Sequence, residues 1–157
     1  MRCRGKLTEP QSAGCTCLRL RKASRRVSQI YDQALEPCGL TVTQYGLLSH
    51  IGALDGIGVG ALAARMVMDP TTLTRNLKPL LEQAFVVLVP DQRDRRARCL
   101  HLTEDGRRTL AEAKPAWRRA QLYLEQVLGE RDAPALNAVL DRVLARLTDA
   151  VAPRSLP

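Results

Sequence analysis

The stretch from Gly58 to Gly106 decides the fold of this chain, and it reads GVGALAARMVMDPTTLTRNLKPLLEQAFVVLVPDQRDRRARCLHLTEDG. Two short segments with apolar residues at helical spacing come first, with a brief turn between them. Two apolar, strand-like segments follow, residues 85–89 and 97–102, and an arginine-rich loop joins them. This order predicts a helix-turn-helix followed by a β-hairpin wing.

The second helix of this pair has clear start signals. Asp69 can cap its first turn, and Pro70 then occupies the first helical position, where its missing N–H costs nothing. Pro79 removes the helical hydrogen bond to the carbonyl of Arg75, so we expect a kink in the last turns. The spacing predicts one buried stripe made of Leu73, Leu77, Leu80 and Leu81.

The opposite face of this helix is polar. It carries hydroxyls, an amide and cations near a helix N-terminus: Thr71, Thr72, Arg75, Asn76 and Lys78. Such groups can hydrogen-bond base edges and phosphates when a helix lies in the major groove of DNA. A solvated face of an ordinary helix is the alternative interpretation.

The loop between the two strands, Asp91–Arg96, holds five charges in six residues and is expected to be a solvated tip. Its cations are Arg93, Arg95 and Arg96. These guanidinium groups can reach phosphates or a narrow minor groove, whose negative potential attracts them. Asp91 and Asp94 would be repelled by phosphate, and we expect each to hold an arginine by a charge-assisted pair. A surface hairpin with internal ion pairs is the alternative.

These motifs together resemble the MarR family of bacterial transcription regulators. The matching pieces are Thr72-Leu-Thr-Arg75, Asp91-x-Arg-Asp-Arg-Arg96, Leu100-x-Leu-Thr103 and Gly106. The resemblance extends from about Cys15 to Leu147 and implies a recognition helix and a wing that contact DNA, with Thr74 and Asp94 among the contact residues. One departure is Ala84, where the family usually has a glycine that ends the recognition helix.

The rest of the chain is expected to be helical. Helices are predicted over residues 15–35, from a T-x-x-Q capping box at Thr41 through Ile51, over 59–66, from Thr103 to about Leu128 with a bend at Pro115, and over 132–150. The last of these has an apolar stripe: Leu136, Val139, Leu140, Val143 and Leu147.

The predicted fold class is therefore mainly α with a small β-hairpin wing. We expect a flexible basic arm at 1–13, a winged helix-turn-helix domain at 41–103, and a helical dimerisation region at 14–36 and 104–150. The terminal helices carry more apolar surface than a small lobe can cover, so we expect them to pair with a second copy. The resemblance implies the same two-fold dimer, which would meet a pseudo-palindromic operator with half-sites ~34 Å apart.

Charge also favours a polyanionic partner, since the net charge is +8 and the pI is about 9.8. Most of this excess lies in residues 1–30, so any DNA-facing charge elsewhere must be local. No apolar run reaches the roughly 20 residues of a membrane span, and the N-terminus lacks the apolar core of a signal peptide. We expect a cytoplasmic protein with no membrane partner and no cofactor.

The cysteines suggest a sensor. Five are present, Cys3, Cys15, Cys17, Cys38 and Cys99, and an odd number in a cytoplasmic chain is not a disulfide scaffold. Cys15 and Cys17 open the first helix near Arg19 and Arg21, and a helix N-terminus with nearby cations favours the thiolate that oxidants and soft metals attack.

The organic-hydroperoxide-sensing branch of the family (OhrR) has a reactive cysteine near the start of its first helix. Counted back from Gln44-Tyr45, Cys17 falls at that position, and Tyr31 matches a tyrosine that hydrogen-bonds the thiol. The two remaining positions of that network hold Arg21 and Val42 here, so the network is incomplete. Two alternatives stay open: a soft metal or arsenite held by Cys15, Cys17 and a third thiol such as Cys38, or inert packing at the dimer interface.

The resemblance also implies a small aromatic or phenolic ligand, and Tyr31, Tyr45, Trp117 and Arg21 are candidates to line its cavity. The leading functional hypothesis is a homodimeric repressor released by oxidant or ligand. The alternative is a small thiol-based redox or metal-binding protein acting through Cys15 and Cys17. We expect no enzyme, because the sequence shows no phosphate loop and no paired catalytic carboxylates, and His50 and His101 are expected to be structural.

Overall fold

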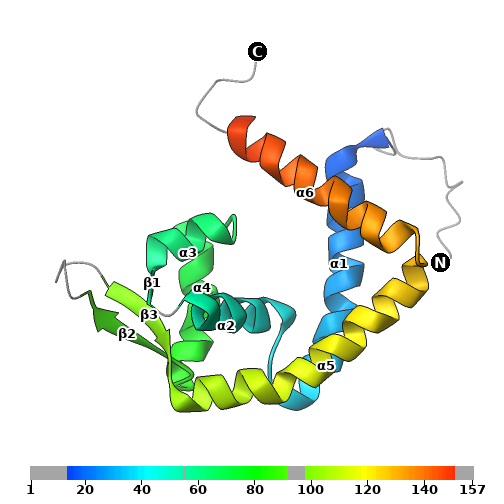
Figure 1. Ribbon diagram of the computed structural model, residues 1–157. Coiled ribbons are helices and arrows are strands. Elements are labelled where there is room, and N and C mark those ends of the chain that lie inside the picture. The colour runs from blue at the N-terminus through cyan, green and yellow to red at the C-terminus, as the bar shows by residue number, and fades with distance from the viewer. Residues whose placement is uncertain (1–13, 55, 92–97, 151–157) are drawn as a thin grey trace, which may run out of the picture.

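The computed structural model describes residues 14–54, 56–91 and 98–150. A winged-helix unit, here residues Val42–Leu102, lies on one side of the molecule, and helices α1 and α6 lie on the other (Figure 1). Helix α5 runs along the lower edge and joins the two sides. The predicted fold class, mainly helical with a small β wing, is confirmed.

The helices outside the winged-helix unit match the predicted ranges closely. They are α1 (Thr16–Leu35), followed by the 3-10 turn η2 (Glu36–Cys38), then α5 (Glu104–Leu128) and α6 (Asp132–Ala150). Gly39 ends the 3-10 turn in the left-handed region, with φ of 68°, and Gly129 separates α5 from α6. Figure 1 shows that α5 is bent, and Pro115 inside it removes one helical hydrogen bond.

The winged-helix unit contains α2 (Val42–Leu54), α3 (Val59–Arg65) and α4 (Pro70–Glu82) with a small sheet. The capping box at the start of α2 forms in both directions. The backbone N–H of Thr41 donates to Gln44 Oε1 at 2.8 Å, and the N–H of Gln44 donates to Thr41 Oγ1 at 3.2 Å. Asp32 of α1 accepts the N–H of Val42 at 2.7 Å, which ties α1 to the first turn of α2.

The wing is part of a three-stranded antiparallel sheet in the order β1-β3-β2, formed by β1 (Ile57–Gly58), β2 (Val86–Pro90) and β3 (Arg98–Leu102). Strand β2 begins one residue later than predicted. Strand β1 was not predicted at all, because two residues are too few to show an alternating pattern. It pairs Ile57 with Leu100, so the wing is anchored to the segment that precedes α3.

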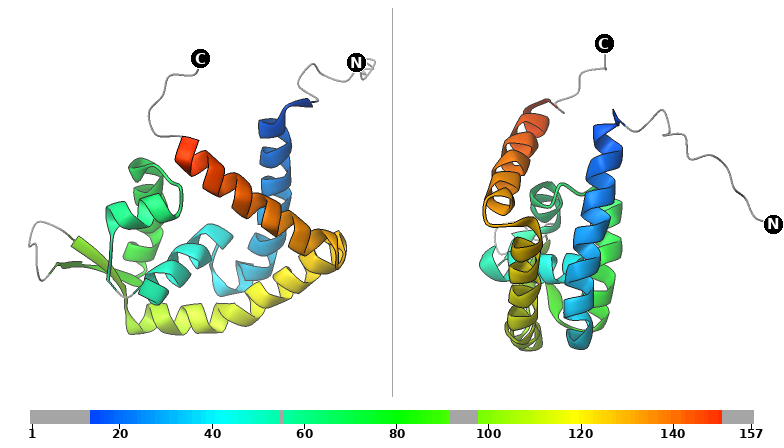
Figure 2. Two further views of the ribbon diagram at one scale, coloured as in Figure 1. Left: turned by 45° about the horizontal axis from the view of Figure 1, so that its top comes forward. Right: turned by 90° about the vertical axis from the view of Figure 1, so that its right-hand side faces the viewer.

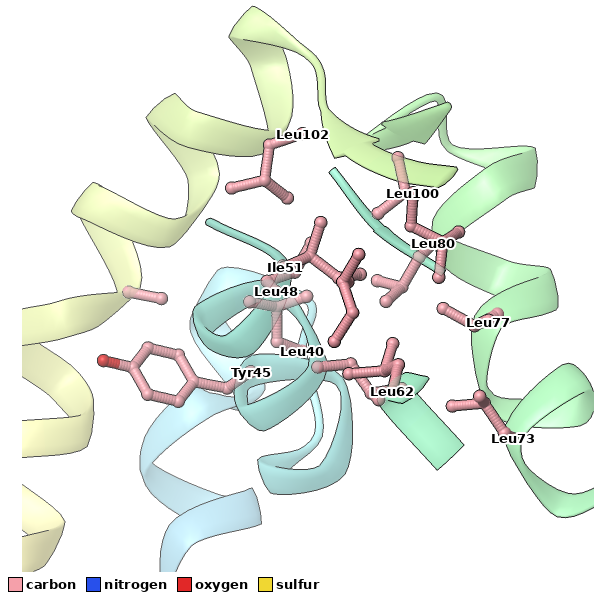
Figure 3. Close-up of a cluster of buried hydrophobic side chains, with 14 of the residues drawn as sticks. Leu40, Tyr45, Leu48, Ile51, Leu62, Leu73, Leu77, Leu80, Leu100 and Leu102 are labelled. Carbon is pink, nitrogen blue, oxygen red and sulfur yellow. The ribbon is translucent and has the colours of Figure 1, made fainter. Parts of the chain in front are cut away.

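The core lies where α2, α4 and the sheet meet, and Figure 3 shows its leucines converging from these elements. Its fully buried large side chains are Leu35, Leu47, Leu48, Ile51, Leu62, Leu73, Leu80 and Leu100. Three members of the predicted α4 stripe, Leu73, Leu77 and Leu80, are buried, while Leu81 is half-buried. This packing fixes which face of α4 points away from the core.

Candidate nucleic-acid interface

Helix α4 begins with a cap that uses both carboxylate oxygens of Asp69. The N–H of Thr72 donates to Oδ1 at 2.9 Å, and the Thr72 hydroxyl donates to Oδ2. These bonds, the hydroxyl first and the backbone N–H next, lower the pKa of Asp69 below its ordinary value. The prediction that Asp69 caps this helix is confirmed.

The exposed face of α4 carries most of the polar residues that the sequence singled out. Because Leu73, Leu77 and Leu80 point into the core (Figure 3), the remaining positions of the helix face away from it. Exposed there are Thr71, Thr72, Thr74, Arg75 and Lys78, and Asn76 is half-buried at the edge. The structure thus presents one continuous polar surface along α4.

Several of these side chains already have partners within the helix. The Thr74 hydroxyl donates to the carbonyl of Pro70 at 2.8 Å, and Asn76 Nδ2 donates to the carbonyl of Thr72 at 2.9 Å. Lys78 lies 3.7 Å from Glu82 in an exposed ion pair. Within the described ranges Arg75 has no hydrogen bond or ion pair, so its five N–H donors are available to a ligand.

The turn before α4 contains an unusual backbone that the sequence did not predict. Val67 has φ of 51°, a left-handed conformation that is an outlier for a β-branched residue. The N–H of Met68 bonds to the carbonyl of Ala63 at 2.9 Å, and the N–H of Val67 bonds to Ala64 at 3.1 Å. These bonds close the end of α3 and set the direction in which the chain enters α4.

Ala84, where the family usually has glycine, has a left-handed backbone conformation. It has φ of 55°, and the N–H of Phe85 reaches back to the carbonyl of Leu80 at 2.9 Å. This is the left-handed helix ending that normally favours glycine, and here alanine adopts it. Helix α4 continues through Pro79, and the N–H of Gln83 bonds to the carbonyl of that proline at 3.0 Å.

The wing strands are paired along their whole length, from Val86 opposite Leu102 to Pro90 opposite Arg98. The predicted wing contacts Arg93, Asp94, Arg95 and Arg96 lie outside the described residues. At the base of the wing, the Cys99 thiol donates to Asp91 Oδ2 at 3.4 Å. Burial raises the pKa of this thiol, and the neighbouring Asp91 carboxylate raises it further.

The predicted sensor residues do not come together within one chain. Cys15 occupies the N-cap position of α1 without a side-chain capping bond, and it is exposed, as are Cys17 and Arg21. Tyr31 lies fourteen residues beyond Cys17 on the same helix, roughly 21 Å away. It is buried, and its hydroxyl donates to Gln121 Oε1 of α5.

The structure keeps Cys38 far from Cys15 and Cys17 of the same chain. Cys38 lies in the 3-10 turn beyond the far end of α1, about 30 Å of helix from Cys15 and Cys17. No three His, Cys, Asp or Glu side chains of the described part of the chain are grouped so that they could hold a metal ion. The hypothesis that Cys38 completes a metal site with Cys15 and Cys17 was wrong for a single chain.

The aromatic residues form a packed cluster between α1, α2 and α5. The rings of Tyr45 and Trp117 are stacked, with centroids 5.7 Å apart and planes 13° apart, and Tyr31 lies 6.3 Å from Trp117. Burial raises the pKa of both tyrosines; Glu125 adds to the shift at Tyr31. Arg21, the fourth predicted cavity residue, is ten residues from Tyr31 along α1 and is not part of this cluster.

Helices α5 and α6 expose a large apolar surface. In α6 three members of the predicted stripe are exposed, Leu136 by 42%, Val139 by 44% and Leu147 by 53%, while Leu140 and Val143 are half-buried. Leu122, Tyr123 and Val127 of α5 are more than half exposed as well. The right-hand view of Figure 2 shows α1 and α6 standing apart, so α1 does not cover this stripe.

Among the described helices, none is long and apolar enough to cross a membrane.

The sequence is similar to those of known transcriptional regulators. The sequence profile of the MarR family matches residues 39–97. The transcriptional activatory protein BadR of Rhodopseudomonas palustris is 31% identical over 118 residues, which cover 71% of this chain and 65% of BadR. The organic hydroperoxide resistance transcriptional regulator of Bacillus subtilis is 28% identical over 90 residues, which cover 57% of this chain and 61% of that regulator.

A solved structure agrees over nearly the whole length. The transcriptional regulator MosR of M. tuberculosis, crystallised with DNA, superposes with a TM-score of 0.77 at 34% identity, covering 88% of this chain and 99% of MosR. The match includes the helices on both sides of the winged-helix unit as well as the unit itself. From its sequence motifs, its fold and these relatives, the chain belongs to the MarR family.

Proposed function

We propose that this protein is a homodimeric transcriptional repressor that binds duplex DNA and loses affinity when an oxidant or a small ligand acts on it. The observation that carries the proposal is the exposed polar face of α4, with Arg75 unpaired among the described residues and the paired wing beside it. MosR has the same architecture and was crystallised with DNA. The relatives are named as transcriptional regulators, which supports a regulatory role over a thiol enzyme.

In the proposed complex, α4 enters the major groove and the wing contacts the flanking minor groove or phosphates. Thr71, Thr72, Thr74, Arg75, Asn76 and Lys78 are assigned to the first contact, and Arg93, Arg95 and Arg96, with Asp94 holding an arginine, to the second. A guanidinium with free donors fits guanine, whose O6 and N7 accept a bidentate pair. Such a protein would act in the cytoplasm, on the chromosome.

The proposed dimer region consists of residues 14–36 and 104–150, with 41–103 as the DNA-binding domain. The uncovered leucines and valines of α5 and α6 support this assignment, because an apolar face of this size is costly in water. A two-fold partner would cover the stripe and place two copies of α4 on successive turns of one DNA face.

For the signal, exposed Cys15 and Cys17 support an oxidant. They lie at the N-terminus of a 20-residue helix, where an oxidant can reach both thiols from solvent. One relative is named for organic hydroperoxide resistance. In a dimer, a partner's residues can reach a thiol that Tyr31 of its own chain does not. A small aromatic ligand is the second candidate, supported by the Tyr31–Trp117–Tyr45 cluster.

The test is fluorescence anisotropy of the reduced protein on its own upstream intergenic DNA, before and after an organic hydroperoxide is added. We expect tight binding that the oxidant abolishes in the wild type and leaves intact in Cys17→Ser. A Cys17→Ser protein that still responds would exclude that thiol. Binding that survives oxidant redirects the search to aromatic ligands, and a promoter fusion decides between repression and activation.

A further inference from the structure

The cap of α4 leaves Thr72 with only acceptor capacity toward a ligand. Its hydroxyl hydrogen is directed at Asp69 Oδ2, while Asp69 Oδ1 accepts the Thr72 N–H at 2.9 Å. Hydrogen bonds to an ionised group are roughly twice as strong as bonds between neutral groups. The Thr72 hydroxyl could donate to a DNA base only if its bond to Asp69 broke. Asp69 and Thr72, here called the Asp69–Thr72 unit, therefore present to a ligand the lone pairs of Thr72 Oγ1 and the negative charge of Asp69.

This unit stands where a recognition helix contacts base edges. Both residues are exposed, and the leucines that follow in α4 point the other way, into the core (Figure 3). Arg75 follows Thr72 by three residues and therefore lies next to it on the helix surface. In helix-turn-helix proteins the residues near the N-terminus of the second helix are those that reach base edges.

We propose that the Asp69–Thr72 unit is a specificity determinant that selects a base carrying an exocyclic amino group, adenine or cytosine, in the major groove. This inference rests on the proposed DNA-binding function. Adenine N6 and cytosine N4 are the donors that base pairs present in this groove. Guanine N7 and O6 and thymine O4 are acceptors, and they would face lone pairs and a negative charge.

The same charge also affects the DNA backbone. Many helix N-termini bind phosphate through free N–H groups. At α4 the Thr72 N–H is already bonded to Asp69, and the carboxylate repels a phosphate. For both reasons, we expect the first turn of α4 to contact base edges and not a phosphate. With Arg75 nearby as a donor-only group, the helix presents acceptors and donors side by side, and the preferred site should pair an amino-bearing base with a neighbouring guanine.

The experiment is selection of binding sites from a randomised duplex library by the full-length reduced protein, compared among variants. Asp69→Asn keeps a strong N-cap but removes the charge and adds a donor. Thr72→Val keeps the shape of the side chain and removes its oxygen. We expect each to lower the preference for adenine or cytosine at one position per half-site about tenfold, while the guanine preference assigned to Arg75 stays. Asp132→Asn, which removes a carboxylate at the start of α6, is the matched control and should leave the preferences unchanged.

Melting temperatures of all variants are measured in parallel, and Asp69→Ser, another good cap without a charge, replaces Asp69→Asn if that variant is unstable. Unchanged base preferences in folded Asp69 and Thr72 variants would overturn the inference and leave Asp69 as a cap alone. A wild type that selects no sequence would overturn both this inference and the proposed function.

Discussion

A Cβ atom at Gly106 would lie 2.0 Å from the carbonyl oxygen of Phe85. This close approach holds the first turn of α5 against the start of β2. Thr103 strengthens the junction, since its hydroxyl donates to the carbonyl of Ala84 at 2.7 Å and accepts the N–H of Gly106 at 2.9 Å. The glycine in the family motif is thus explained by contact between two backbones.

Gly106→Ala is expected to destabilise the protein by more than about 3 kcal/mol, the upper end of the usual cost of overpacking, because a backbone oxygen must move. Chemical denaturation followed by circular dichroism measures this. Gly60→Ala in α3 is the control, since its Cβ meets nothing within 4 Å. A helical Gly→Ala change there should stabilise by about 0.5–1 kcal/mol. Equal effects at the two positions would contradict the proposed junction.

Glycine should be preferred at the two left-handed positions, Val67 and Ala84. A residue with a Cβ pays roughly 1–2 kcal/mol there, partly offset by the greater freedom of glycine when unfolded. We expect Val67→Gly and Ala84→Gly each to raise the melting temperature by a few degrees, measured by calorimetry. Val67 is 74% exposed, so little burial is lost. Ala53→Gly, at an exposed position of α2, should instead lower the melting temperature, because glycine is a poor helix former.

The apolar stripe of α6 should control assembly. Val139→Asp places a charge in the proposed two-fold interface, so we expect a monomer in sedimentation experiments and weak DNA binding. Ala145→Asp lies on the opposite side of the same helix and is the matched control. A dimer that tolerates Val139→Asp would show that the stripe is not the interface.

Replacing an arginine of α4 and replacing an arginine of the wing should weaken DNA binding in different ways. Arg75→Ala removes a base contact worth about 1–3 kcal/mol, so both affinity and sequence preference should fall. Arg96→Ala removes a wing contact to the backbone, which should weaken binding uniformly and reduce the salt dependence by about one charge. Anisotropy titrations at several salt concentrations, on specific and scrambled duplexes, separate these outcomes. Equal losses on both duplexes for Arg75→Ala would make it a phosphate contact.

The thiols should differ in reactivity. The pKa of Cys99 is raised, so at any pH below that value it holds less thiolate than an ordinary cysteine. Alkylation by iodoacetamide, followed by peptide mass spectrometry, should therefore label Cys99 more slowly than exposed Cys15 and Cys17, and its labelling should rise only at higher pH. Asp91→Asn should speed the alkylation of Cys99, because the Asp91 carboxylate raises the pKa of that thiol. Fastest labelling at Cys99 would contradict this environment.

The elements with strong local signals were predicted correctly from sequence. The capping box at Thr41 and Gln44, the Asp69 cap and the period of the α4 leucines each depend on neighbours within a few residues. The winged arrangement followed from the order of such elements. Family resemblance added the role of Gly106 as a motif position but not its reason, which depends on Phe85 twenty-one positions earlier in the chain.

What the sequence did not reveal depends on tertiary structure. Strand β1 is two residues long and exists because Leu100 pairs with Ile57. The left-handed backbone of Val67 contradicts local preference and is imposed by the turn. The separation of Cys17 from Tyr31 follows from the length of α1, and the same length separates Cys38 from Cys15 and Cys17 within one chain. Which hydroxyls are already bonded within α4 was visible only in three dimensions.

Helix α5 has a mechanical consequence. Its start is hydrogen-bonded to Phe85, just before β2, and to Leu102 of β3. Its middle contacts α1 through Gln121, and its end leads into α6. At 1.5 Å per residue its 25 residues span at most about 37 Å, because α5 bends at Pro115. A tilt of about 5° at the end near α6 would shift the end near the wing by at most ~3 Å, close to one base-pair step of DNA. In the proposed repressor, a chemical change near α1 or α6 would in this way alter how the wing end fits the DNA.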